Sequence, residues 1–324
     1  NNIISPNSKT FIIAEIGVNH EGVASNCLKM IFAAHKSGAD MIKLQIIDHN
    51  DSYEKGTVSY QLFKKTQMSK EEIFNIYKIC RRNKIKVFST FDKKNFEFFK
   101  NLNQDCYKIS SSLFYDFYFI KKILATRKPL IISSGLSDLE DIDVLLKLLK
   151  YNTNKKIALL HCRSLYPTVF NKLNLARINF LKNKYNMIVG FSDHSLGINA
   201  SVASIHHGAK IIEKHFTLDS KKPSFDHKIS LEPKQFKRMV NEIRVNESMI
   251  GSPDFKVFDK TEDFKKMKIF IRGFKLNTNI KKDKILKSSD FSLVRSKQPK
   301  NITKFSKIIN FVLKKKNKKT FKKR

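Results

Sequence analysis

Charged side chains with catalytic potential end a series of short apolar segments in this chain. Glu15 lies near the end of the first segment, Lys43 and Lys108 near the ends of two others, and His194 and His215 near the ends of the last two. A lysine at the end of a buried strand is costly to desolvate unless an anion or a carboxylate meets it. Two histidines with open positions suit a divalent ion such as Mn²⁺. If the segment ends converge, they predict a site for an anion and a metal.

Hydroxyl side chains follow the same pattern. Several hydroxyls beside two ammonium groups suit a small, highly charged ligand that carries phosphate and carboxylate groups. For any one serine a satisfied core hydroxyl is the simpler interpretation, and two histidines alone also fit many structural roles. Asp193 is a further residue that could ligate or orient, and Glu15 and Asp226 are the other carboxylates expected to face the site. The hydroxyl residues are Thr90, Ser110, Ser111, Ser133, Ser134, Ser164 and Ser192.

The apolar segments themselves predict a parallel barrel. Each has the length of a strand and is almost continuously apolar, as a strand buried on both faces should be. Segments with helical spacing lie between them, and Ser69 with an acidic residue three positions later is a capping-box pattern. Eight alternations favour an α/β fold of the (β/α)8 TIM-barrel type, whose strands gather their C-terminal ends at one mouth. The expected strands are 11–17, 39–45, 84–90, 106–111, 129–135, 157–164, 187–194 and 209–216, and the expected helices 24–37, 69–83, 92–102, 116–126, 138–150, 171–184, 196–207 and 233–249.

A doubly wound open sheet is the rival architecture. It is disfavoured because the residues after the first expected strand, GVNHEG, do not form the glycine-rich GxGxxG fingerprint. The chain has 324 residues, so a barrel of about 250 residues leaves room for one small extra domain. We therefore expect a barrel followed by a second, smaller unit.

The composition restricts the cell compartment and the partners. Four cysteines without CxxC spacing indicate reduced thiols in a cytoplasmic protein. No apolar run approaches the ~18 residues that a membrane span needs, and no targeting segment is evident, so we expect no membrane contact. The net charge of +34 comes from lysines spread along most helices, which disfavours a dedicated nucleic-acid face and predicts a positive mouth that attracts an anionic substrate. The exception is the like-charge block 314–324, expected to be a disordered tail.

Several motifs, in order through about residues 10–245, resemble those of the sialic acid synthases, which include the N-acetylneuraminate, legionaminic acid and pseudaminic acid synthases. Residues 270–299 resemble the small antifreeze-like (SAF, β-clip type) domain that follows the barrel in this family. The resemblance implies a synthase barrel at 1–250, a linker at 251–268, an abbreviated antifreeze-like domain at 269–313 and the basic tail at 314–324. The motifs are AEIGVNHEG (14–22), IKLQ (42–45), YKISS (107–111), SSGLSDLEDI (133–142), LLHCRSLYPT (159–168), GFSDHSLG (190–197), EKHFTLD (213–219) and DHKISLEP (226–233).

The resemblance also implies a reaction and roles for residues. Such enzymes condense phosphoenolpyruvate with an open-chain N-acetylated aminosugar, such as N-acetylmannosamine or a 2,4-diacetamido-6-deoxyhexose, to a nine-carbon 2-keto acid and phosphate. A divalent metal, Mn²⁺ or else Mg²⁺ or Co²⁺, would be held at His194 and His215, and Glu15 would be the acid/base carboxylate. A domain-swapped homodimer would bring Arg295 to the partner's barrel. Phosphoenolpyruvate would contact Lys43, Thr90, Lys108, Ser111, Ser133, Ser164 and Ser192, and the sugar would contact Gln45, Tyr166, Asp226 and Arg295.

Some residues depart from the family pattern. Leu113 stands where the family carries an acidic residue, and Arg295 is followed by Ser296 where the family continues with a Pro-Gly-x-Gly loop. A variant acceptor sugar or a low-activity enzyme would explain these changes. Two other functions stay open at this point: a barrel synthase that uses phosphoenolpyruvate with another aldose, and an RNA- or polyanion-binding protein. The last predicts a steeply salt-dependent affinity for nucleic acid.

Overall fold

The structure is a computed structural model that describes residues 4–151, 156–223, 226–252, 254, 262–267, 270, 272–276 and 291–295. Contacts within the chain divide it into two compact units, 1–250 and 251–324. Each unit is described by itself. Among the described residues no helix is long and apolar enough to span a membrane.

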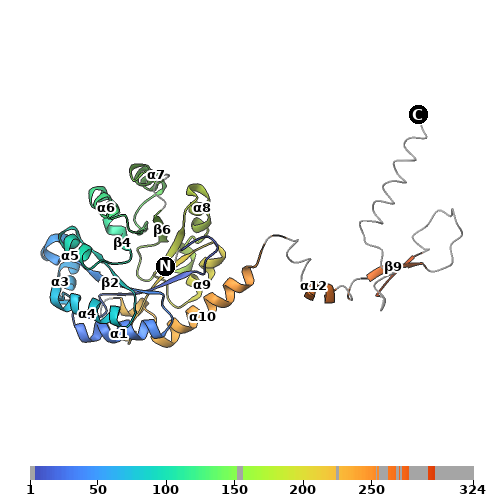
Figure 1. Cartoon of the computed structure of the whole chain (residues 1–324), viewed down its shortest axis with the longest axis horizontal. Coiled ribbons are helices and arrows are strands. Elements are labelled where there is room, and N and C mark those ends of the chain that lie inside the picture. Colours follow the sequence, from blue (N-terminus) through green and yellow to red (C-terminus); the bar gives the residue numbers. More distant parts are fainter. Residues whose placement is uncertain are drawn as a thin grey trace. The chain divides into compact units, whose positions relative to one another are not determined.

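The first unit is a closed barrel of eight parallel strands with helices around the outside (Figure 1). Each strand pairs with its neighbours in sequence, and β1 closes the barrel by pairing with β8. The (β/α)8 prediction is therefore confirmed, and the open doubly wound sheet was wrong. The strands are β1 Phe11–Gly17, β2 Met41–Ile46, β3 Val87–Phe91, β4 Tyr107–Ile109, β5 Leu130–Ser133, β6 Ile157–Cys162, β7 Val189–Asp193 and β8 Ile211–His215.

Eight α-helices of the barrel match the segments expected to be helical, and two of them, α8 and α10, extend one residue beyond the expected end. Ser69 and Glu72 form the predicted capping box at the start of α4, where each side chain accepts a hydrogen bond from the other residue's backbone amide. Apolar faces of these helices pack on the outer face of the sheet, for example Ile73 and Ile76 of α4. The helices are α1 Ala24–Lys36, α4 Lys70–Arg82, α5 Phe96–Asn101, α6 Phe117–Leu124, α7 Leu139–Leu148, α8 Ala176–Tyr185, α9 Asn199–His206 and α10 Pro233–Ile250.

Two short helices between β2 and α4 were not expected from the sequence. They are α2, His49–Ser52, and α3, Val58–Lys65. Asp48 and Thr57 cap them by accepting hydrogen bonds from backbone amides of the first turn. Helix α3 matters for function because it borders the barrel mouth. Single 3-10 turns cover Lys93–Asn95, Ser111–Leu113, Phe170–Lys172 and His227–Ile229.

The barrel interior changes from apolar to polar in one step along the strands. Its lower layer is a packed cluster of inward-facing side chains that includes Ile13, Met41 and Ile211. Side chains alternate across a strand, so the residue two positions later points to the same face. Two positions after these three residues stand Glu15, Lys43 and Glu213, all buried. The apolar layer thus forms the floor of a polar layer at the mouth. The cluster is Ile13, Met41, Phe88, Cys106, Ile131, Leu160 and Ile211.

The second unit contains helix α12, Glu262–Met267, and an antiparallel pair of strands, β9 Arg272–Leu276 and β10 Phe291–Arg295. The pairing places Arg295 opposite Arg272. The antifreeze-like domain expected at 269–313 stays a prediction. Most of that range, half of the expected linker 251–268 and all of the tail 314–324 lie outside the described residues.

Candidate active site

The mouth of the barrel holds a cavity of about 430 Å³ at the C-terminal ends of the strands. Thirteen of the fourteen residues to which the family resemblance gives a role line it. The exception is Arg295, which belongs to the second unit. The thirteen are Glu15, Lys43, Gln45, Thr90, Lys108, Ser111, Ser133, Ser164, Tyr166, Ser192, His194, His215 and Asp226.

Strand register is the reason that these distant residues meet. Glu15 pairs with Lys43 on one side and with His215 on the other, because β1 lies between β2 and β8. Thr90 pairs with Lys108 across β3 and β4. Residues at the same level of neighbouring strands share one layer of the barrel. The register therefore places Glu15 between Lys43 and His215, and it places Lys108 next to Thr90.

The two lysines share a buried carboxylate, Glu213. Its Oε2 lies 2.8 Å from Nζ of Lys43, and its Oε1 lies 3.8 Å from Nζ of Lys108. Ser192 Oγ donates to the same Oε1 over 2.9 Å. Burial opposes ionisation of Glu213, but Lys108 and Lys43 outweigh it and lower the pKa of this carboxyl to about 2. Sequence reasoning missed Glu213, although it stands two positions before His215 and so points to the same face of β8.

Each of the two lysines also has a second partner. Lys43 forms a second ion pair with Glu15, and Lys108 Nζ donates to Ser133 Oγ over 2.7 Å. Two acidic and two basic side chains thus lie at the base of the cavity, and all four are buried. Burial lowers the pKa of Lys43 to about 7, against the opposing effect of Glu213. An anion that carries more than one negative group would favour the ammonium form of both lysines.

His194 and His215 lie side by side above this layer, with ring centroids 5.5 Å apart. Nδ1 of His194 donates to the backbone carbonyl of Arg163 over 2.8 Å, which leaves Nε2 as the acceptor nitrogen. Burial, together with His215, lowers the pKa of His194 to about 4, and burial with Lys43 lowers that of His215 to about 3. Both rings are therefore neutral near pH 7, the form in which imidazole binds a metal.

Unpartnered polar atoms mark the space that a ligand would fill. Among the described residues, Glu15 Oε1, Thr90 Oγ1 and His215 Nδ1 are buried without a hydrogen-bond partner. Asp226 Oδ2 lies 3.6 Å from His215 Nδ1, beyond hydrogen-bonding distance. A buried polar group without a partner costs free energy, so this set points to a missing polar or cationic ligand.

Gly17 keeps the same space open. A Cβ at this position would lie 3.3 Å from Glu15 Oε1, 3.5 Å from Asp226 Oδ2 and 3.7 Å from His215 Cε1. The backbone φ of +56° also favours glycine.

The donor set fits the expected divalent metal: two neutral imidazoles with carboxylates nearby. No group of three or more His, Cys, Asp or Glu in the described ranges is arranged as a complete ligand set, so substrate or water would have to complete the coordination.

The rim of the cavity is less polar. Tyr166 packs against His194 with ring centroids 4.2 Å apart. Helix α3 contributes Ser59, Leu62 and Phe63, which sequence reasoning missed because this short helix was not expected. Such a rim suits apolar parts of a ligand better than a further charged group.

Three residues considered for the site lie elsewhere. Asp193, weighed as a ligand or an orienting group, is fully buried in an ion pair with Lys214 and does not line the cavity. Ser134 Oγ donates to the carbonyl of Leu160. Arg295 is exposed within the second unit, and its guanidinium carbon lies 5.0 Å from the ring centroid of Phe270.

A TIM barrel whose mouth gathers paired lysines, carboxylates and neutral imidazoles defines an enzyme that acts on an anionic substrate. The chain belongs to the NeuB family, whose model matches residues 30–254, and it is an enzyme of that type. It is 36% identical to a pseudaminic acid synthase of Campylobacter jejuni over 302 residues, which cover 89% of this chain and 87% of the relative. It is 33% identical to an N,N'-diacetyllegionaminic acid synthase of the same species, over 90% of this chain and 91% of the relative.

A solved structure agrees with this assignment. The N-acetylneuraminic acid synthetase of Leptospira borgpetersenii, crystallised with citrate, superposes with a TM-score of 0.77 at 29% identity. The match covers 82% of this chain and 93% of that structure. The resemblance seen in the sequence motifs is thereby confirmed as family membership.

Proposed function

We propose that this enzyme condenses phosphoenolpyruvate with an open-chain N-acetylated aminosugar, giving a nine-carbon 2-keto acid and inorganic phosphate. The observation that carries the proposal is the ring of two lysines, hydroxyls, a carboxylate and two neutral imidazoles around one cavity. The names of the relatives, synthases of pseudaminic and N,N'-diacetyllegionaminic acid, support a keto-acid sugar as the product.

The chemistry needs opposite charges at two places. A bond forms between the methylene carbon of phosphoenolpyruvate and the aldehyde carbon, and the aldehyde oxygen takes a proton. Water adds to the former enol carbon, and the tetrahedral product then expels phosphate to leave the ketone. Positive charge develops at the enol carbon and negative charge at the aldehyde oxygen, so a nearby carboxylate and a nearby cation lower the barrier.

The residues of the cavity suit these steps. Lys43 and Lys108 would bind the phosphate and carboxylate of phosphoenolpyruvate, with Thr90, Ser111, Ser133, Ser164 and Ser192 donating hydrogen bonds. Glu15, whose Oε1 is without a partner among the described residues, would stabilise the cation and move protons. His194 and His215 would hold a divalent ion, which we propose is Mn²⁺. When bound, that ion supplies a Lewis acid for the aldehyde oxygen.

The lining also favours an acceptor without a phosphate group. Lys43 and Lys108 are the only lysines or arginines among the described residues that line the mouth, and both are already engaged by carboxylates. The rim offers Leu62, Phe63 and Leu136 in place of a further cation. A neutral sugar with acetamido groups and a deoxy carbon, such as a 2,4-diacetamido-6-deoxyhexose, fits such a rim better than a sugar phosphate. Gln45, Tyr166 and Asp226 would contact it.

The remaining expectations are part of the same proposal. Residues 269–313 would form the antifreeze-like domain of a domain-swapped homodimer, and Arg295 would grip an N-acetyl group in the partner's site. The cytoplasm is the expected compartment, where phosphoenolpyruvate is made.

The test is a phosphate-release assay with the purified full chain, phosphoenolpyruvate and Mn²⁺. We expect release only when an N-acetylated hexose is added, with a 2,4-diacetamido-6-deoxyhexose better than N-acetylmannosamine and much better than N-acetylmannosamine 6-phosphate. No release with any of the three would refute the proposed reaction. Faster release with the 6-phosphate would refute the unphosphorylated acceptor alone.

A further inference from the structure

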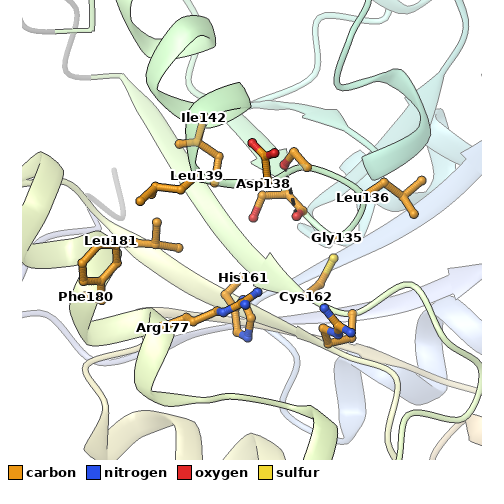
Figure 2. Close-up of a pocket in the computed structure, with 13 residues that line it drawn as sticks. Gly135, Leu136, Asp138, Leu139, Ile142, His161, Cys162, Arg177, Phe180 and Leu181 are labelled. Atoms are coloured by element: carbon orange, nitrogen blue, oxygen red, sulfur yellow. Dashed lines mark hydrogen bonds between the residues drawn. The ribbon is translucent and has the colours of Figure 1, made fainter.

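A second cavity, of about 550 Å³, lies beside the barrel mouth between α7 and α8 (Figure 2). Small-molecule sites commonly enclose ~300–1,000 Å³ and are mostly apolar with a few polar groups. Here Leu139 and Ile142 of α7 face Phe180 and Leu181 of α8. The volume is therefore that of a ligand site, with an apolar part between the two helices and polar residues around it, and the proposed reaction makes no use of it.

Two arginines that have no side-chain partner among the described residues line this cavity. Within the described part of the chain, neither Arg163 nor Arg177 has a side-chain hydrogen bond or an ion pair. Arg163 follows β6 and is half-buried, and Arg177 lies on α8. Guanidinium groups are weakly hydrated and match the oxygen geometry of phosphate and carboxylate groups. The pair provides anion-binding capacity that no described protein group takes up.

His161 lies between the cavity and the barrel core, and it brings no negative charge that would pair with the arginines. It lies on the outer face of β6, and its Nε2 donates to the carbonyl of Leu173 over 2.7 Å. Burial, with both arginines adding to it, lowers the pKa of His161. Asp138 is the one carboxylate in the described lining, and Figure 2 shows it across the cavity from Arg177 and His161. Its Oδ1 accepts from the Asp141 amide over 2.9 Å, so the N-terminus of α7 offsets part of its charge.

We propose that this cavity is a second binding site, for an organic oxyanion. Its phosphate or carboxylate group contacts Arg163 and Arg177, and its apolar body lies on Phe180, Leu181 and Ile142. The site adjoins the active site, because Leu136 and Cys162 line both cavities. Arg163 also connects them, since its carbonyl orients His194.

Gly135, which lines the second cavity, packs closely against residues of the mouth. A Cβ there would lie 2.3 Å from Cys162 Sγ and 2.5 Å from Ser164 Oγ, so the chain packs directly against the residues of the mouth. Substitutions on the α7 and α8 side of Gly135 and substitutions in the mouth can therefore test the two cavities separately.

The test is calorimetric titration of the full chain with phenyl phosphate, without phosphoenolpyruvate or metal. Benzoate replaces it in a second arm, which distinguishes phosphate from carboxylate as the preferred group. We expect Arg177→Ala to weaken binding of the preferred probe at least tenfold. The matched control Arg238→Ala, an exposed arginine of α10, should leave the affinity unchanged. Equal affinity of wild type and Arg177→Ala for both probes would overturn the proposal.

Two further variants separate this site from the active site. Lys108→Met should keep the Arg177-dependent binding, whereas its loss in Lys108→Met would show that the probe binds only at the mouth and would overturn the proposal. Ile142→Trp fills the cavity and should abolish binding in a protein that still unfolds cooperatively. Inorganic phosphate should bind more weakly than phenyl phosphate, and equal affinities would overturn the role of the apolar half. Because no reaction is measured, failure of the proposed synthase activity leaves these outcomes unaffected.

Discussion

Asp193 and Lys214 form a fully buried ion pair that joins β7 to β8, with 3.1 Å between Oδ2 and Nζ. Each stands next to one of the two imidazoles of the site, His194 and His215. Asp193 also accepts hydrogen bonds from the amide and hydroxyl of Ser195, and Lys214 donates to the carbonyl of the same serine. The pair therefore fixes the backbone from which both imidazoles project.

Removal of one partner of this pair should be far more harmful than removal of both. Lys214→Met leaves a buried carboxylate without its cation, and we expect the free energy of unfolding to fall by about 3–5 kcal/mol. The double variant Asp193→Asn, Lys214→Met should recover a large part of that loss in urea unfolding. Lys184→Met, which breaks the exposed pair with Asp143, is the matched control and should have a much smaller effect. A double variant no more stable than Lys214→Met would contradict this account.

Glu15→Gln should separate binding from turnover. The side chain keeps its shape but loses the charge that contacts Lys43 and the capacity to exchange a proton. We expect kcat to fall by about 10²–10⁴-fold, while the affinity for phosphoenolpyruvate changes little. Stopped assays give the first quantity and calorimetric titration with phosphoenolpyruvate gives the second. A normal kcat would remove Glu15 from the mechanism.

Much of the fold and most of the site followed from the sequence because a barrel imposes a simple order. The alternation of buried strands and helices was enough to predict the topology. The C-terminal ends of the strands were enough to predict which residues lie near the mouth. The two-residue alternation that places Lys43 above Met41 also places Glu213 above Ile211. The same alternation applied to β8 predicts that Glu213 points to the same face as His215, two positions later.

Other features could not be found in this way. Helix α3 has only eight residues, and the rim that it forms with Leu62 and Phe63 depends on how the connection after β2 folds back over the mouth. The role of Asp193 depended on its direction, because a residue at a strand end next to a histidine points to the opposite face. The cavity at Arg177 depends on the packing of α7 and α8, which leaves no local pattern in the sequence.

His215→Ala should weaken metal binding but leave the binding of phosphoenolpyruvate intact. The substitution removes one of the two neutral imidazoles, whereas Lys43 and Lys108 remain in place. We expect the Kd for Mn²⁺, measured from the electron paramagnetic resonance signal of the free ion, to rise by more than about 100-fold. His20→Gln, which changes a buried histidine outside the described cavity lining, serves as the control. Unchanged Mn²⁺ affinity in His215→Ala would rule out the proposed metal site.

His20 should make stability depend on pH. Burial lowers its pKa from 6.5 to about 4, and its Nδ1 accepts from the Gly22 amide over 3.0 Å. The unfolded chain therefore binds a proton at higher pH than the folded chain, so the free energy of unfolding falls as the pH drops from about 6.5 to about 4. At pH 4.5 the loss from this group should be roughly 2.5 kcal/mol. Urea unfolding at pH 7 and 4.5 should show a smaller decrease for His20→Gln than for wild type, and an equal decrease would contradict the assignment.

Arg295→Ala should affect the sugar more than phosphoenolpyruvate. The arginine ends β10 in the second unit, next to Phe270, and in the proposed dimer it contacts the N-acetyl group of the acceptor. Loss of a hydrogen bond from a charged donor is worth about 1.5–3 kcal/mol, so we expect the KM for the sugar to rise by about 10–100-fold while that for phosphoenolpyruvate stays within twofold. Arg272→Ala is the matched control, because Arg272 is the exposed residue paired with Arg295 across the two strands.

Mixing Arg295→Ala with the inactive Glu15→Gln chain provides a second check. If each chain supplies its arginine to the other's barrel, mixed dimers contain a site with both Glu15 and Arg295 intact, and that site should show the wild-type KM for the sugar. Mixtures whose KM for the sugar stays at the Arg295→Ala value after subunit exchange would exclude the swapped arrangement.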